Sequence, residues 1–279
     1  MKKVGILISF VLITLLATPA YAGFFDDGRD YMASDQWQEI TAFDPNDRMS
    51  IIDFGTRLEY RASSVSGEEP FRAYASKWYF NLDQDFTTRV RYFYAHAGTE
   101  ENDTGGLDLI AYNFDSFNST IQSGLPPQHF SVSAENAMWD INGTLYNKYR
   151  YYAGANTDSS TPDAEVEASW RRGTSQGFLE IQYDQSEDEL WMAASEYDSM
   201  SNVYLPVGSF EYDNISDLGI EKMGIVLGGR SDGAVLSSSE AYFSDFSVET
   251  GDPVVTPEPL SSILFLIGGA GFVTKKILS

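Results

Sequence analysis

The chain has 279 residues, of which 43% are hydrophobic and 14% aromatic, and it contains no cysteine. Acidic residues outnumber basic residues by 41 to 18, which gives a formal net charge of −23. A surface of this sign repels phosphate backbones and argues against nucleic acid as a partner, while the apolar content is too high for a disordered chain. The lack of cysteine excludes thiolate metal sites, thiol nucleophiles and disulfide bonds.

The N-terminus has the pattern of a secretory signal peptide. Lys2 and Lys3 form a positive region, and residues 4–17 form an apolar run. The small residues that signal peptidase recognises, followed by the expected first residue of the mature chain, are Ala20, Ala22 and Gly23. We expect residues 1–22 to be a cleaved signal peptide on an exported protein; the alternative is an uncleaved anchor helix.

The body of the chain, residues 23–252, shows no long helical periodicity. Alternating, β-branched and aromatic runs occur instead, separated by clusters of Gly, Asn, Asp, Ser and Pro. The predicted strands are 51–61, 75–81, 86–97, 107–114, 145–153, 166–171, 178–184, 189–195, 203–212, 220–227 and 241–249. So many strands in one stretch predict an all-β domain, an antiparallel two-sheet sandwich, with helix confined to the N-terminal signal and a C-terminal hydrophobic segment.

Single strands show the period of two expected for a half-buried sheet. In residues 86–94, Val90 and Tyr92 share one face, and Arg89 and Arg91 share the other. Residues 178–192 have the pattern of a hairpin. The glycine-rich stretch "GGRSDG", residues 228–233, lacks the Lys-Ser/Thr of a phosphate-binding loop and is predicted to be a turn.

The order of these segments resembles the concanavalin A-like lectin/glucanase superfamily, including laminin G-like domains. The matching stretches are 24–28 followed by Trp37, 177–192, and 241–248 followed by Gly251. The resemblance implies a jelly roll whose first and last strands lie side by side. That pairing would bring Phe24 and Phe25 close to Phe243 and Phe246. A discoidin-like or immunoglobulin-like sandwich remains an alternative.

The C-terminus has three parts in order. A Pro-Glu-Pro motif precedes an apolar run at 260–273, which as a helix would cover about 21 Å, short of a bilayer core of about 30 Å. The motif and the basic residues after the run are Pro257, Glu258, Pro259, Lys275 and Lys276. This ending resembles the PEP-CTERM sorting signal of Gram-negative bacteria; the alternative is an ordinary tail anchor.

The PEP-CTERM resemblance implies a route through the cell envelope. Residues 253–279 would form a linker and a sorting signal with a short transmembrane helix. This helix would hold the protein in the inner membrane, with its lysines on the cytoplasmic side, until an exosortase processes the chain. The protein would then reach the cell surface or the extracellular matrix, often in organisms that make exopolysaccharide.

No catalytic residue can be assigned from the sequence. His96 and His129 are the two histidines, and neither lies in the context of a catalytic triad. Glucanases of the resembled superfamily carry E-x-D-x-E or E-x-D-x-x-E on one strand, and this chain has neither. The nearest stretches are Glu165-Val166-Glu167 and the segment from Glu180 to Asp184. We therefore expect a protein that is not an enzyme.

One predicted strand carries a candidate sugar-binding stripe. In "LYNKYRYYAG" the alternation places four side chains on one face: Tyr146, Lys148, Arg150 and Tyr152. Tyrosine faces can stack on sugar rings, and the cations can pair with acidic polysaccharide. The alternative is that these tyrosines only cover a sheet edge.

A calcium site is a further candidate, because the resembled fold often carries structural Ca²⁺ and hard cations need clustered oxygens. If the terminal strands pair, the carboxylates that could meet are Asp26, Asp27 and Asp245. A second oxygen-rich loop holds Asp44, Asn46 and Asp47. The alternative in both places is a set of solvated loop residues.

The sequence thus predicts an exported cell-surface or matrix protein, either a non-catalytic glycan-binding protein or a structural component of an exopolysaccharide or biofilm matrix. Its partners would be signal peptidase, exosortase, the inner membrane for a time, and a polysaccharide. Two alternatives stay open at this point: a secreted glycoside hydrolase of the glucanase type, and a purely structural adhesin without sugar affinity.

Overall fold

The computed structural model describes residues 23–40, 44, 46–63, 67–95, 100–101, 103–116, 128–157, 164–167, 171–172, 175–233 and 235–255. For 164–167 and 171–172 it describes the backbone alone. The predicted signal and sorting residues that lie outside these ranges are Ala20, Ala22, Pro257, Glu258, Pro259, Lys275 and Lys276. Within the ranges, no helix has the length and apolar character needed to span a membrane.

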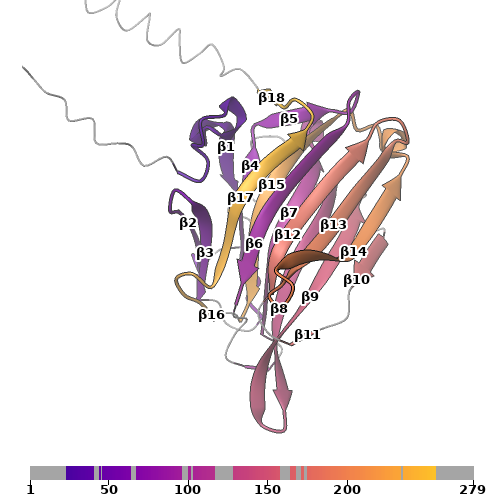
Figure 1. Cartoon of the computed structure of the whole chain (residues 1–279). Helices are drawn as coiled ribbons and strands as arrows, with labels where there is room; N and C mark the ends of the chain where they lie inside the picture. The colour runs from indigo at the N-terminus through magenta and orange to yellow at the C-terminus, as the bar shows by residue number, and fades with distance from the viewer. Residues whose placement is uncertain are drawn as a thin grey trace, which may run out of the picture.

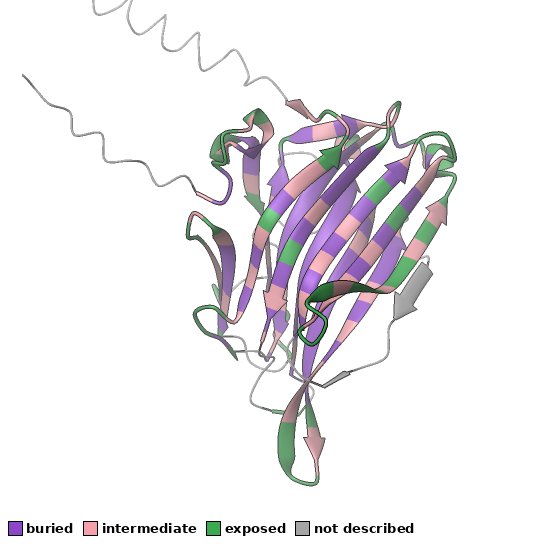
Figure 2. Ribbon diagram, in the orientation of Figure 1, coloured by how far each residue is buried: buried purple, intermediate pink, exposed green. Residues whose placement is uncertain are grey.

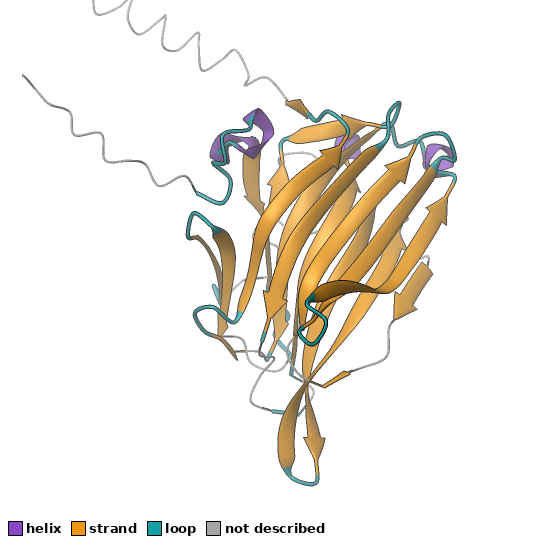
Figure 3. Cartoon of the chain, viewed as in Figure 1, coloured by secondary structure: helices purple, strands orange, loops and turns teal. Residues whose placement is uncertain are grey.

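Two antiparallel sheets pack face to face, which confirms the predicted all-β jelly-roll sandwich (Figures 1 and 3). The first sheet has the order β1-β4-β15-β7-β8-β9-β10, and the second has the order β14-β13-β12-β6-β17-β3-β16. In the first sheet, β5 pairs with β15, β18 pairs with β5, and β11 pairs with β9. In the second sheet, β2 pairs with β3. Four short 3-10 helices among the described residues span Asp30–Met32, Ser34–Gln36, Phe114–Ser116 and Ile215–Leu218.

The strands of the first sheet are β1 (Trp37–Ile40), β4 (Phe71–Ser76), β5 (Trp78–Asn81), β7 (Thr104–Asn113), β8 (His129–Ile141), β9 (Thr144–Asn156), β10 (Ala164–Glu167), β11 (Arg171–Arg172), β15 (Lys222–Asp232) and β18 (Val254–Val255). Those of the second sheet are β2 (Met49–Asp53), β3 (Arg57–Ser63), β6 (Phe86–Tyr94), β12 (Ser175–Asp184), β13 (Glu189–Asp198), β14 (Val203–Asp213), β16 (Val235–Leu236) and β17 (Ala241–Thr250).

The core lies between the two sheets and follows from the alternation of each strand (Figure 2). On β6, Val90 and Tyr92 are fully buried, whereas Arg91 is exposed and Arg89 half-buried, as the pattern predicted. The predicted hairpin at 178–192 is also confirmed, because β12 and β13 pair from Gly177 opposite Glu196 to Asp184 opposite Glu189. Aromatic side chains fill much of this interior, so the sandwich is held by ring packing instead of by disulfides.

The predicted pairing of the first and last strands is wrong. β1 pairs with β4 in the first sheet, whereas β17 lies between β3 and β6 in the second. The two ends of the domain meet through side chains in the core, where the ring of Trp37 lies 5.8 Å from that of Phe246 and 4.7 Å from that of Phe25. Residues 254–255, which the sequence analysis placed in the linker, form β18 and pair with β5.

Two local predictions also differ from the structure. Residues 51–61 were predicted as one strand but form the β2–β3 hairpin. The stretch 228–233 was predicted as a turn, but β15 continues through it to Asp232, paired on both sides by β4 and β7. Its glycines serve close packing, since a Cβ at Gly229 would lie 2.2 Å from the ring of Tyr60.

We predict that Trp78→Ala destabilises the sandwich by about 3–5 kcal/mol, because it removes a large side chain from a close-packed core. Trp78 is fully buried, and its ring lies 5.5 Å from that of Trp37 and 5.4 Å from that of Phe80. Urea denaturation measures the change. The matched control is Trp191→Ala, at a site 39% exposed, which should cost about 1 kcal/mol or less. Equal losses from both variants would contradict the core assignment.

Candidate functional site

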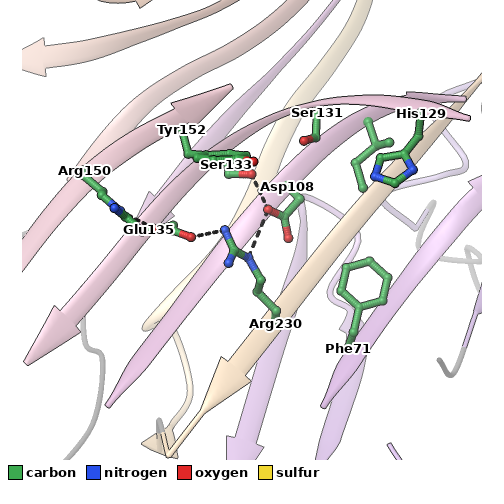
Figure 4. A pocket seen from close by; sticks show the side chains of 10 residues that line it. Phe71, Asp108, His129, Ser131, Ser133, Glu135, Arg150, Tyr152 and Arg230 are labelled. Atoms are coloured by element: carbon green, nitrogen blue, oxygen red, sulfur yellow. Dashed lines mark hydrogen bonds and ion pairs between the residues drawn. The ribbon is translucent and has the colours of Figure 1, made fainter. Parts of the chain in front are cut away.

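A hollow of about 460 Å³ lies on the outer face of the first sheet, over β15, β7, β8 and β9 (Figure 4). Its volume falls within the range of about 300–1,000 Å³ that is typical of ligand sites. The residues that line it are Phe71, Asp108, Ile110, His129, Ser131, Ser133, Glu135, Arg150, Tyr152 and Arg230. Charged, hydroxyl and aromatic groups therefore meet on one surface of the sheet.

The register of four strands produces this arrangement. Residues directly opposite one another form one row across β15, β7, β8 and β9 that consists of Arg230, Gly106, Glu135 and Arg150. The next row consists of Gly228, Asp108, Ser133 and Tyr152. Residues two apart in a strand point to the same face, so both rows belong to the floor of the hollow.

Arg230 connects the two rows. Its Nε lies 3.3 Å from Oδ1 of Asp108, and its Nη2 pairs with Oε1 of Glu135 (Figure 4). Glu135 also pairs through Oε2 with Nε of Arg150 at 2.5 Å. Gly106 makes the crossing possible, because a Cβ there would lie 3.2 Å from Nε of Arg230. The network is therefore built into the sheet and does not depend on a loop.

The hydrogen bonds of Asp108 leave one of its oxygens unpaired. Ser133 donates its hydroxyl to Oδ1, the same atom that faces Arg230. Oδ2 is buried and has no hydrogen-bond partner. A buried acceptor without a donor is costly, so a donor that enters the hollow and reaches Oδ2 would relieve that cost.

The two carboxylates have pKa values shifted in opposite directions. Burial raises the pKa of Asp108, and the charge of Arg230 offsets this only in part. Burial also acts on Glu135, but the charges of Arg230 and Arg150 outweigh it and hold the pKa of Glu135 below its usual value. The formal charges of the two arginines and two carboxylates cancel, which makes this patch neutral on a strongly acidic chain.

The sequence-predicted stripe on β9 is divided by the structure. Tyr149 and Tyr151 of β9 are buried, and their hydroxyls contact Glu196 and Tyr92 of the second sheet. The alternate residues face outward: Arg150 and Tyr152 line the hollow, while Tyr146 and Lys148 lie farther along β9, toward the β8–β9 turn.

The sequence analysis missed the groups that hold the hollow together. Asp108 is the single acid of β7, and Glu135 follows a run of small and apolar residues on β8, which is a signal that could have been used. Arg230 was hidden in the stretch predicted as a turn. His129 stands at the start of β8 and lines the hollow, whereas His96 lies outside the described residues.

Of the candidate calcium residues, Asp27 and Asp245 line one hollow together with Arg29 and Arg89, and Asp26 is not part of its lining. Asp26 accepts the backbone N–H of Ser34 at 3.0 Å, and Asp27 pairs with Arg29. Asp245 lies 3.6 Å from Arg91. Across the parts of the chain that the structure describes, no group of three or more acidic or histidine side chains is placed to hold a metal ion. Because arginines already face Asp27 and Asp245, this set does not fit a divalent cation.

The second oxygen-rich loop is occupied by the protein's own donors. Asp44 accepts the backbone N–H groups of Arg48 and Met49, and its Oδ2 lies 2.8 Å from Nε of Arg72. Asp47 also pairs with Arg72. This loop is thus an anchor for Arg72 on β4 and does not present the oxygen cluster that calcium needs.

The acids closest to the glucanase pattern lie on two different sheets. Glu180 lies on β12 in the second sheet, 3.7 Å from Nε of Arg89, and Asp184 accepts N–H groups of the following turn. Glu165 and Glu167 lie on β10, for which the backbone alone is described. In the hollow, Arg230 contacts both carboxylates, those of Asp108 and Glu135.

No protein-family model and no curated protein sequence matches the chain. Several solved structures are similar in fold. The legume lectin-like domain from Entamoeba histolytica is 10% identical with a TM-score of 0.44, over 80% of this chain and 91% of that one. The potassium-bound carbohydrate recognition domain of Emp46p is 11% identical with a TM-score of 0.47, over 83% and 98%. The metal-free lectin I-B4 from Griffonia simplicifolia is 14% identical with a TM-score of 0.42, over 82% and 98%.

We predict that Arg230→Met destabilises the protein by about 2–4 kcal/mol at neutral pH, because two largely buried carboxylates lose their shared counter-charge. The lowered pKa of Glu135 gives native stability that is present above the ordinary carboxyl pKa and lost as pH falls through the lowered value. The penalty for Arg230→Met should therefore shrink as pH falls below about 4, the ordinary pKa of a glutamate, because protonation neutralises the carboxylates.

Urea denaturation at neutral and acidic pH measures this effect. Arg91→Met is the matched control, because Arg91 is 45% exposed and, among the described residues, its ion pair is with Asp245 at 3.6 Å. It should change stability by about 0.5 kcal/mol or less at either pH. A penalty for Arg230→Met that is independent of pH would show that the network does not work by charge compensation.

Proposed function

We propose that this chain is a non-catalytic glycan-binding protein and that the hollow over β15, β7, β8 and β9 is its sugar site. The observation that carries the proposal is a set of polar groups already held in place on the sheet, with aromatic groups beside them. Sugars present hydroxyls around apolar ring faces, and such a site matches both features.

Arg230 is the main donor of the proposed site. Its contacts with Asp108 and Glu135 use two of the five N–H groups of a guanidinium, and its side chain is 40% exposed. The carboxylates fix the orientation of these donors before a ligand arrives, which lowers the entropy cost of binding. Hydroxyl oxygens of a sugar can accept hydrogen bonds from Arg230, while the ring of Tyr152 offers a flat face.

The charge balance of the site points to a neutral glycan. Arg230 and Arg150 are compensated by Asp108 and Glu135, so the hollow has no excess positive charge to attract a polyuronate. The rest of the protein repels such a polymer, because the chain carries a formal net charge of −23. Among the ligands considered from the sequence, an acidic polysaccharide therefore fits less well than a neutral one.

The proposed setting is the cell surface or extracellular matrix of a Gram-negative bacterium. It rests on residues 1–22 and 253–279, which have the patterns of a signal peptide and a PEP-CTERM sorting signal. Signal peptidase and exosortase would act on the two ends, and the inner membrane would hold the intermediate. The proposed role is binding to an exopolysaccharide of the matrix.

Glycan binding is tested with the purified protein on an array of neutral glucans, mannans, xylans and galactans beside a polyuronate. We expect binding to at least one neutral polymer, no binding to the polyuronate and no release of reducing ends. Tyr152→Ala should weaken binding about tenfold, equivalent to about 1.4 kcal/mol for a lost ring contact. Tyr242→Ala, on β17 of the second sheet, is the control and should leave binding unchanged.

An array that stays blank for every neutral polymer would contradict the glycan-binding proposal and favour a structural adhesin. Release of reducing sugars that is abolished by Glu135→Gln would instead favour a hydrolase.

For sorting, we predict that replacing Pro257, Glu258 and Pro259 by alanine leaves the protein in the inner-membrane fraction of its host. The prolines keep the segment before the apolar run extended and open to a protease, and alanines allow the helix to continue. Pro253→Ala, upstream of the motif, is the control and should be released normally. Fractionation and immunoblotting measure the outcome, and unchanged release of the triple variant would rule out the sorting assignment.

A further inference from the structure

Strands β8 and β9 extend beyond the rest of the sandwich as a projecting hairpin (Figure 1). They join at Asn142 and Gly143, whose φ angles of 56° and 80° suit a tight hairpin turn. Trp139 lies close to this turn, is 44% exposed and belongs to neither apolar cluster of the described core. A large exposed indole outside the core is a candidate for binding a ligand.

The hairpin continues the face that forms the hollow. The register is continuous from Glu135 opposite Arg150, through Ala137 opposite Lys148, to Trp139 opposite Tyr146. Because side chains two apart share a face, Trp139 lies on the same strand face as Glu135. Nζ of Lys148 lies 5.8 Å from the ring centre of Trp139.

The distance along this face exceeds the size of one sugar. Ser133 in the hollow and Trp139 are six residues apart on β8. At about 3.3 Å per residue, the distance between them along the strand is about 20 Å. Ala137, which is only 2% exposed, separates the polar network from the indole. The face therefore presents a hydrogen-bonding end in the hollow and an aromatic end near the turn.

We propose that Trp139 is a second stacking platform and that the ligand is an internal stretch of a linear neutral polysaccharide, several sugars long. One sugar would occupy the hollow beside Arg230 and Tyr152, and the chain would follow the β8–β9 face until another ring stacks on Trp139. This inference rests on the proposed function, and it adds the length of the ligand and a residue that selects for length.

A polysaccharide suits this surface better than a lipid bilayer or a protein. The indole is continuous with a hydrogen-bonding hollow, and the same hairpin carries Asp140 on a chain of net charge −23, which an anionic membrane would repel. The other end of this face, in the hollow, carries the ion pair of Glu135 and Arg150, unlike the apolar centre of a typical protein interface.

The test uses size ladders of neutral β-linked gluco-, manno- and xylo-oligosaccharides, titrated by calorimetry into the full-length protein. With the native protein we expect affinity to rise with length. Trp139→Ala should weaken binding of the long oligosaccharides about tenfold, leave the shortest binder within about twofold, and abolish the rise with length. Trp191→Ala, an exposed tryptophan of the second sheet, is the matched control and should preserve the native length dependence.

The outcomes separate the two proposals. No binding by the native protein to any ladder would overturn the proposed function together with this inference. Native binding that does not depend on length, or a Trp139→Ala protein that still gains affinity with length, would overturn the inference alone. Binding of neutral vesicles that is lost in Trp139→Ala, in place of length-dependent sugar binding, would assign the hairpin to a membrane.

Discussion

The structure depends on apolar contact between two sheets, because the chain has no cysteine to join them. Each strand contributes alternate side chains to the interior, and rings such as those of Phe80 and Phe86 pack across it. Some polar groups in this space pair with one another, as the hydroxyls of Tyr92 and Tyr151 do. The remaining alternate positions must face outward, so charged and hydroxyl side chains collect on the outer surfaces of the sheets.

On the first sheet this outward face becomes a rigid polar floor. Arg230, Asp108 and Glu135 lie on neighbouring strands, so their backbones are fixed by ladder hydrogen bonds. Ion pairs of this kind add modestly to stability, since desolvation offsets much of their attraction. Their larger effect is on position: each carboxylate limits how the guanidinium can turn, and Gly106 leaves the space in which it crosses β7.

The sequence could predict features that depend on neighbours in the chain, and it could not predict those that depend on strand partners. Period-two alternation identified the outward and inward faces of β6, and local turn chemistry identified the hairpin at 178–192. The meeting of Arg230 with Asp108 joins residues 122 positions apart, which depends on the order of strands in the sheet. No local pattern contains that order.

The wrong prediction of a turn at residues 228–233, which contain Arg230, has a specific physical origin. Gly228 and Gly229 indicate a turn when taken alone, yet in the sheet a Cβ at either position would strike the ring of Phe71 or Tyr60. Glycine permits close approach as readily as it permits a turn, and the sequence alone does not separate these roles. For the same reason the sequence did not identify Arg230 as a site residue, because Arg230 follows these two glycines directly.

A shallow site on a sheet face and a long polymeric ligand fit each other. The hollow is broad and open, so a single sugar within it makes few contacts and would bind weakly. A linear chain that continues along β8 and β9 adds contacts without a second cost for overall immobilisation. On the proposed function, the locally neutral patch would bind an uncharged polymer while the net charge of −23 keeps neighbouring copies of the protein apart.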